Sequence, residues 1–185
     1  TEGGFSVERV KQIVGTESIE EVLGNIFLLN PVNFEEQKKA FSILLDKLKE
    51  EQIGLIVVDG MAMLYRLELG DAVKQGDSEK IKEVNREAAR QMRILAEIAR
   101  KKNIPILITN QVYEDFVPEE QWRKGIRGNI NLVGGDLLQY WCKCIIQLDN
   151  YNGKRKAFLM KHRSLPESEL NFEIKNEGIC KKGWI

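Results

Sequence analysis

Two short apolar runs, each followed by a polar residue, constrain the fold of this chain most strongly. Leu55–Val58 is followed directly by Asp59, and Ile104–Thr109 is followed by Asn110 and Gln111. Short aliphatic runs between turn signals are typical of buried strands in a parallel sheet. Helical apolar patterns occupy residues 33–51 and 78–102. This alternation predicts an α/β fold in which helices flank a parallel central sheet.

Further elements are predicted before these runs and between them. Ser6 is a candidate N-cap for a helix that Gly15 ends, and a second short helix fits 18–23. The apolar run Ile26–Leu29 precedes Asn30-Pro31 and predicts another buried strand. Residues 70–77 contain two glycines and mixed charges, which predicts a surface loop before a helix capped by Ser78.

The C-terminal part has the pattern of antiparallel edge strands. Ile145–Leu148 and Lys156–Met160 flank an Asn152-Gly153 turn signal, and Leu170–Ile174 follows as a further strand. Because the sequence shows no repeat and no linker, we expect one domain over 1–185.

Composition removes several classes of protein. The 28 basic and 28 acidic side chains cancel, so bulk positive charge cannot hold nucleic acid. No apolar run approaches the roughly 20 residues that span a bilayer. Cys142 and Cys144 form a C-x-C pair without a second pair or a histidine cluster, so reduced thiols of a cytoplasmic protein are expected rather than a zinc site.

Three polar residues are candidates for chemistry at the carboxyl ends of strands, where α/β sheets bind ligands. Asp59 suits Mg²⁺, held directly or through water, although a strand-end or helix-cap role also fits. Gln111 has an amide that can contact a terminal phosphate, or it is a simple strand-terminal residue. Glu2 can orient an attacking water, or it is an exposed turn residue.

The combination and order of five segments resemble RecA-type recombinases over nearly the whole chain. The segments are Thr1–Arg9, Leu55–Asp59, Ile108–Val112, Gly134-Gly135 and His162–Glu167. The resemblance implies a RecA-like P-loop ATPase core that binds ATP and Mg²⁺. It implies that Glu2 activates water, that Asp59 belongs to the Walker B strand, and that Gln111 senses the phosphate.

The phosphate loop itself is absent from these residues. No G-x-x-x-x-G-K-[ST] occurs, and the one Gly-Lys pair is Gly153-Lys154 in the expected hairpin. In the family that loop lies upstream, so we expect that an N-terminal part of roughly 50 residues is missing from this domain. Such a chain is expected to expose apolar sheet surface.

Two segments are candidate DNA contacts. In the family, the loop that corresponds to residues 113–131 binds DNA; here its second half carries Trp122, Arg123, Lys124 and Arg127, although a solvated loop is the alternative. Residues 151–163 carry five basic side chains and no acid. The DNA-binding candidates there are Lys154, Arg155, Lys161, His162 and Arg163. A basic edge hairpin that prevents strand pairing is the alternative.

Within this family the chain is most similar to an archaeal paralogue of the recombinase RadA. That resemblance implies an accessory protein of DNA repair and homologous recombination that binds ATP and DNA, with at most weak DNA-independent ATPase activity and no strand exchange. The implied partners are DNA and either a RadA-type recombinase or a Holliday-junction nuclease. The resemblance also implies that the protein can associate with itself and that it does not bind a membrane. An ATP-independent adaptor and a true RadA-type strand-exchange recombinase are the alternatives.

Overall fold

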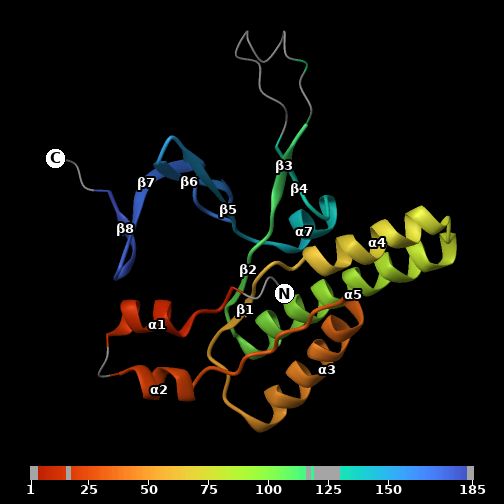
Figure 1. Cartoon of the computed structure of the whole chain (residues 1–185), viewed down its shortest axis with the longest axis horizontal. Coiled ribbons are helices and arrows are strands. Elements are labelled where there is room, and N and C mark those ends of the chain that lie inside the picture. The colour runs from red at the N-terminus through yellow and green to blue at the C-terminus, as the bar shows by residue number, and fades with distance from the viewer. Residues whose placement is uncertain (1–3, 16–17, 116–117, 119–129, 183–185) are drawn as a thin grey trace. The chain divides into compact units, whose positions relative to one another are not determined.

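The two apolar runs that were predicted to be parallel strands, Leu55–Val58 and Ile104–Thr109, each contain a strand in the computed structural model. The structure describes residues 4–15, 18–115, 118 and 130–182, and these divide into two compact units (Figure 1). Of the described residues, those between Leu29 and Trp141 form one unit, and those of Gly4–Leu28 and Cys142–Lys182 form the other. The first unit combines helices with strands, which confirms the α/β class. A single domain over 1–185 stays a prediction.

Strands β1 (Ile56–Val58) and β2 (Ile106–Ile108) pair in parallel, with Val58 opposite Ile108. Ile56 is buried, whereas the side chains of Val57 and Leu107 keep more than half of their surface exposed (54% and 57%). The prediction that these runs contain strands is confirmed, whereas the prediction that they are buried throughout is wrong, because Leu55, Val57 and Leu107 are exposed. A larger parallel central sheet stays a prediction.

The prediction of a strand at Ile26–Leu29 is wrong. These residues have no strand structure, and Phe27 and Leu28 are exposed. A strand needs a hydrogen-bonded neighbour, and none of the strand pairs in the described residues includes this run. Apolar composition alone therefore did not decide its structure.

Three helices form the core of the first unit: α3 (Phe34–Glu50), α4 (Met63–Gln75) and α5 (Ser78–Lys102). Asn33 begins α3 as predicted, because its side-chain oxygen accepts the Glu36 backbone N–H at 2.8 Å. Phe34, Leu64 and Val84 then meet in one apolar cluster, to which each helix contributes one residue.

The corner between α4 and α5 differs from the predicted loop at 70–77. Helix α4 continues through Gly70 to Gln75, so two residues are enough to reverse the chain. Gly76 adopts a left-handed conformation (φ 67°), which a residue without Cβ reaches at low cost. Asp77, and not Ser78, caps α5 by accepting the Lys80 backbone N–H at 2.9 Å.

Strands β3 (Val112–Glu114) and β4 (Ile130–Leu132) pair antiparallel and bracket most of the predicted 113–131 loop. Helix α7 (Asp136–Trp141) follows, and Gly134 lies between β4 and α7. A Cβ at Gly134 would lie 3.3 Å from the Leu138 side chain and 3.6 Å from the Ala62 Cβ. The glycine therefore permits close packing there.

In the second unit, strands β5 (Ile145–Tyr151), β6 (Lys154–Lys161), β7 (Ser168–Lys175) and β8 (Gly178–Lys181) form an antiparallel sheet in chain order. The predicted hairpin turn is confirmed, with positive φ at Asn152 (50°) and Gly153 (76°).

Two short helices accompany this sheet, α1 (Val7–Val14) and α2 (Ile19–Gly24). Ser6 caps α1 as predicted. The Arg9 guanidinium donates to the carbonyl oxygens of Lys175 and Asn176, at 2.7 and 3.2 Å, and so fastens α1 to the β7–β8 turn. Within the described part of the chain, no helix is both long and apolar enough to cross a bilayer.

Candidate functional site

The carboxyl ends of β1 and β2 bring Asp59 and Thr109 together. The Thr109 hydroxyl donates to Asp59 Oδ1 at 2.5 Å and accepts the Gly60 backbone N–H at 2.8 Å. The Met61 N–H donates to the Thr109 carbonyl at 3.2 Å. Gly60 has a φ of 75°, in the left-handed region that favours glycine. Thr109 therefore fixes the turn that carries Asp59.

The two residues after Thr109 connect this strand end to the end of β4. The Asn110 side-chain amide donates to the Val133 carbonyl at 2.6 Å, and the Val133 N–H donates to the Gln111 carbonyl at 3.1 Å. The backbone of Gln111 is thus held between the β1–β2 pair and the segment before Gly134, while its side chain is exposed.

An exposed carboxylate beside a hydroxyl suits a hard divalent cation. Mg²⁺ prefers oxygen ligands and usually keeps several waters while one or two carboxylates hold it. In the described ranges, no group of three or more His, Cys, Asp or Glu side chains forms a metal cage. The arrangement fits a cation that Asp59 holds directly or through water. Oxygen atoms of a bound ligand would complete its coordination shell.

The structure brings two of the predicted site residues together, and several others fall outside the described residues. Asp59 and Gln111 lie at the same end of the β1–β2 pair, as the predicted strand order requires. Glu2 falls outside the described residues, as do four DNA-binding candidates of the loop: Trp122, Arg123, Lys124 and Arg127. The roles of all these residues stay predictions.

Sequence reasoning gave Thr109 no role, although the signal was present. Val58 pairs with Ile108, so the residues that follow them, Asp59 and Thr109, are neighbours across the strand pair. Thr109 is the last residue of the second apolar run and lies one position after β2, as Asp59 lies one position after β1, so parallel pairing in register brings the two together.

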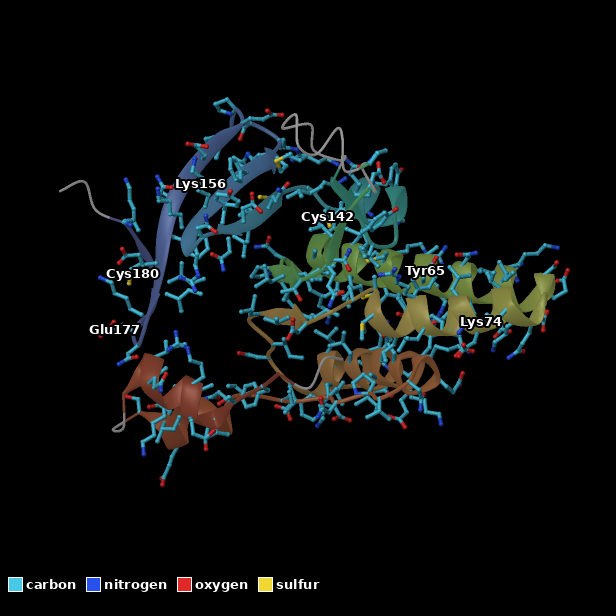
Figure 2. The ribbon with its side chains drawn as sticks, turned by 45° about the horizontal axis from the view of Figure 1, so that its top comes forward. Tyr65, Lys74, Cys142, Lys156, Glu177 and Cys180 are labelled. Atoms are coloured by element: carbon cyan, nitrogen blue, oxygen red, sulfur yellow. The ribbon has the colours of Figure 1, made fainter. Side chains whose placement is uncertain are left out.

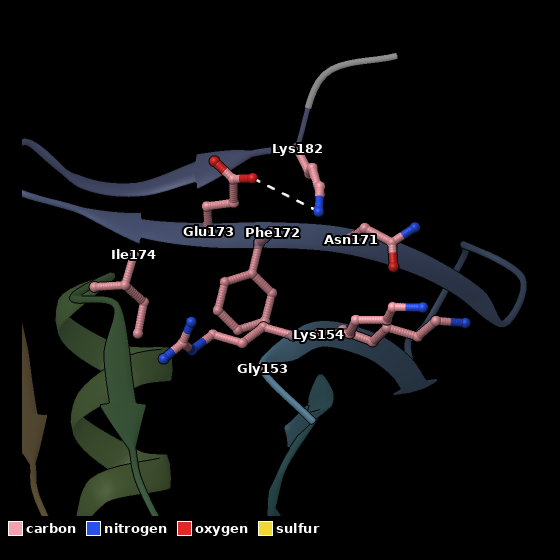
Figure 3. A pocket seen from close by; sticks show the side chains of 9 residues that line it. Gly153, Lys154, Asn171, Phe172, Glu173, Ile174 and Lys182 are labelled. Carbon is pink, nitrogen blue, oxygen red and sulfur yellow. Dashed lines mark ion pairs between the residues drawn. The ribbon is translucent and has the colours of Figure 1, made fainter. Parts of the chain in front are cut away.

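The basic segment 151–163 is divided between two ends of β6. Lys154 and Arg155 lie near the hairpin turn, and together with Lys156 and Lys182 they line a hollow of about 610 Å³ (Figure 3). The alternation of β6 puts Lys154 and Lys156 on one face and Arg155 on the other. Sequence reasoning missed Lys182, which comes after β8 and pairs with Glu173 at 3.8 Å.

The other basic group lies at the far end of β6, roughly 20 Å along the strand by its rise per residue. It consists of Lys161, the last residue of β6, with His162 and Arg163. His162 Nδ1 accepts the backbone N–H groups of Ser164 and Leu165 at 3.2 and 3.0 Å. His162 therefore holds this turn through its ring nitrogen, which accepts both backbone N–H groups.

None of the three cysteines of the described residues is in a disulfide, and their reduced state in a cytoplasmic protein stays a prediction. Cys142, Cys144 and Cys180 are all free, and Figure 2 labels Cys142 and Cys180. Burial raises the pKa of the Cys142 thiol above its ordinary value, whereas Cys144 is exposed. A partly buried thiol with a raised pKa is a poor nucleophile at neutral pH.

Comparison with known proteins agrees with this arrangement of motifs. A family model described as Rad51 matches residues 1–182. A protein of Methanococcus maripaludis strain C7 named "DNA repair and recombination protein RadB" is 42% identical over 180 residues, which are 97% of this chain and 74% of that protein. Proteins of the same name from Methanobrevibacter smithii and Methanocaldococcus jannaschii are each 37% identical, over 97% of this chain and 72% and 76% of their own lengths. The chain belongs to the Rad51 family and, within it, to the RadB proteins of archaea.

Proposed function

We propose that this protein binds ATP with Mg²⁺ and binds DNA, as an accessory protein of DNA repair and homologous recombination in the cytoplasm. The names of its relatives support the biological role. The observation that carries the nucleotide part is the hydrogen bond between Thr109 and Asp59 at the joined ends of β1 and β2. We expect at most weak hydrolysis and no strand exchange.

The residues present fit Mg²⁺. Asp59 would hold the ion, and Thr109 would keep the carboxylate in one orientation through its hydroxyl. Bound Mg²⁺ would neutralise part of the phosphate charge that develops when ATP is cleaved. Glu2 would orient the attacking water, and Gln111 would contact the terminal phosphate through its side-chain amide.

The residues present do not supply the phosphate cradle. The Gly153-Lys154 pair, the one Gly-Lys pair of the sequence, lies in the β5–β6 hairpin turn. A phosphate cradle needs successive backbone N–H groups at the start of a helix. The Asn152-Gly153 turn joins two strands and does not begin a helix. The fit therefore covers the cation and not the triphosphate.

DNA contact is proposed for both basic groups of β6. Lys154, Arg155, Lys156 and Lys182 line a hollow together with the acidic Glu173. Lys156 pairs with Glu169 at 3.1 Å and Lys182 with Glu173 at 3.8 Å, so Lys154 and Arg155, on opposite faces of β6, are the cations proposed to meet a phosphate backbone. The loop candidates Trp122, Arg123, Lys124 and Arg127 remain part of the proposal. A RadA-type recombinase or a Holliday-junction nuclease is the proposed protein partner, and self-association is compatible with this role.

Thermal unfolding of the full-length protein tests the nucleotide proposal. ATP with Mg²⁺ should raise Tm because a ligand that binds the folded state stabilises it. Asp59→Asn should remove the magnesium-dependent part of that rise. Asp46→Asn is the matched control, because Asp46 is an exposed aspartate of α3 that pairs with Lys49 at 2.7 Å. It should leave the rise unchanged.

Three outcomes separate the candidate functions. If ATP changes neither Tm nor partner affinity, an ATP-independent adaptor is the better description. If the protein forms filaments on single-stranded DNA with strong DNA-stimulated ATPase activity, it is a strand-exchange recombinase of the RadA type. An ATP-dependent rise in Tm without filaments supports the proposal.

A further inference from the structure

Two glutamines are buried beneath the turn that carries Asp59. Gln37 of α3 keeps 2% of its surface exposed, and Gln91 of α5 keeps none. Both stand at positions where the neighbouring inward residues of their helices are apolar, such as Phe41 and Leu95. Burial of an amide has a free-energy cost unless its hydrogen bonds are replaced, so packing alone does not account for the pair.

The hydrogen bonds of the pair lead from the surface of α5 to the backbone of that turn. Glu87 Oε1 accepts from Gln91 Nε2 at 3.0 Å, and Gln91 Oε1 accepts from Gln37 Nε2 at 2.7 Å. Gln37 Nε2 also lies 3.4 Å from the Met61 carbonyl oxygen, which it donates to. Met61 follows Asp59 by two residues, and its N–H is already bonded to Thr109.

The orientation of both amides follows from their neighbours. The Glu87 carboxylate and the Met61 carbonyl can accept and cannot donate, so each of them faces an amide nitrogen. Gln37 Oε1 is the atom left over, and among the described residues it has no hydrogen-bond partner. It belongs to a residue that lines a cavity of about 10 Å³ together with Met61, Ala62 and Gly134.

We propose that Gln37 and Gln91 are positioning residues for Asp59. Thr109 holds the turn from the neighbouring strand, and Gln37 holds the Met61 carbonyl from the helical layer, so the turn is fixed on two sides. The unpartnered oxygen is a cost that a role in stability alone does not explain. This inference rests on the proposed function, in which Asp59 holds Mg²⁺.

The test replaces both amides in the full-length protein with Gln37→Met and Gln91→Met. Methionine is similar in length and flexible, and changing both residues leaves no amide without its partner. Hydrogen exchange should become faster at the Gly60 and Met61 amides, while amides in the middle of α3 and α5 stay protected. The Mg²⁺ concentration that gives half of the ATP-dependent rise in Tm should increase by about threefold to tenfold, as expected for the loss of one hydrogen bond.

Phe41→Leu is the matched control, because it disturbs the same face of α3 one turn later without removing an amide. It should leave both readouts unchanged. Unchanged exchange at Gly60 and Met61 in a folded double variant overturns the inference, as does equal acceleration in the Phe41→Leu control. If the double variant does not fold, Gln91→Met alone, which keeps the Gln37 donor to the Met61 carbonyl, is judged by the same exchange measurement.

The exchange measurement needs no nucleotide. If the unmodified protein shows no response to ATP and Mg²⁺, the proposed nucleotide function fails. Faster exchange in the double variant would then still show that the glutamines hold the turn, and unchanged exchange would refute it.

Discussion

The hydroxyl of Thr109 and the carboxylate of Asp59 are joined by a hydrogen bond of 2.5 Å across two parallel strands, although the residues are separated by 50 positions in the chain. The same hydroxyl accepts the Gly60 N–H, so one side chain holds both the carboxylate and the turn that follows it. Such a carboxylate has lost much of its rotational freedom before any ligand arrives, which lowers the entropic cost of binding a cation.

Thr109→Val should therefore weaken the response to Mg²⁺. Valine has nearly the shape of threonine but cannot donate to Asp59 or accept from Gly60. We expect a loss of about 1 kcal/mol in the free energy of unfolding and a higher Mg²⁺ requirement for the ATP-dependent rise in Tm. Thr109→Ser keeps the hydroxyl and should restore the Mg²⁺ requirement. An equal effect of valine and serine would contradict this role.

A second prediction concerns pH. Burial opposes ionisation of Glu87, but hydrogen bonds from Arg90 and Gln91 outweigh it, so the pKa of Glu87 lies below its ordinary value. A carboxylate whose pKa is lowered by folding stabilises the folded state at pH values above its ordinary pKa. That contribution should disappear as the pH falls through the lowered value.

Glu87→Gln should accordingly flatten the decline of Tm between pH 6 and pH 3 relative to the unmodified protein. Arg90→Met removes the bidentate donor, at 2.8 and 2.9 Å, and should shift the decline to higher pH. Thermal scans across this range measure both effects. A decline with the same midpoint in all three proteins would show that Glu87 does not contribute.

If the basic hollow binds DNA, the affinity for DNA should depend on the salt concentration through its lysine and arginine residues. Lys154→Ala with Arg155→Ala should weaken binding to duplex DNA and reduce the slope of log K against log salt by about 0.9 for each phosphate that the protein no longer neutralises. Adding Lys182→Ala should reduce it further. Lys74→Ala on α4 (Figure 2) is the control, because Lys74 is exposed and lies in the other unit. A slope that stays constant would exclude the hollow as a DNA-binding surface.

Thiol reactivity should separate the two cysteines of the C-x-C pair. Burial raises the pKa of Cys142, whereas Cys144 is exposed, so at pH 7.5 iodoacetamide should modify Cys144 first. Peptide mass spectrometry after timed quenching measures the order. Faster modification of Cys142 would show that this segment opens in solution.

The strands of the fold were predictable where local pattern and tertiary pairing agree. The runs that became β1 and β2, and the Asn152-Gly153 turn, carry signals that physical chemistry makes strong. Ile26–Leu29 carries the same apolar signal but belongs to none of the strand pairs of the described residues, and Gly70 sits inside α4 because helix packing tolerates one glycine. The composition of an apolar run does not determine whether another strand pairs with it.

The candidate site was predictable in part for the same reason. A polar residue after an apolar run can be read from the sequence, which identified Asp59 and Gln111. The register that places Thr109 beside Asp59 is a property of strand pairing. Gln37 was missed because a polar residue inside an apolar helical face gives no sign of whether it is buried and bonded or displaced toward solvent.

The two-residue corner at Gly76 and Asp77 has a consequence for the order of folding. It allows α4 and α5 to meet through contacts that are close in the chain, whereas the pairing of Ile56 with Ile106 must close a loop that contains both helices. We expect the helical hairpin to be formed in the transition state and the strand pair to follow. Kinetic φ-values near one for Asp77→Ala and near zero for Ile106→Val would show this sequence of events, and the reverse pattern would refute it.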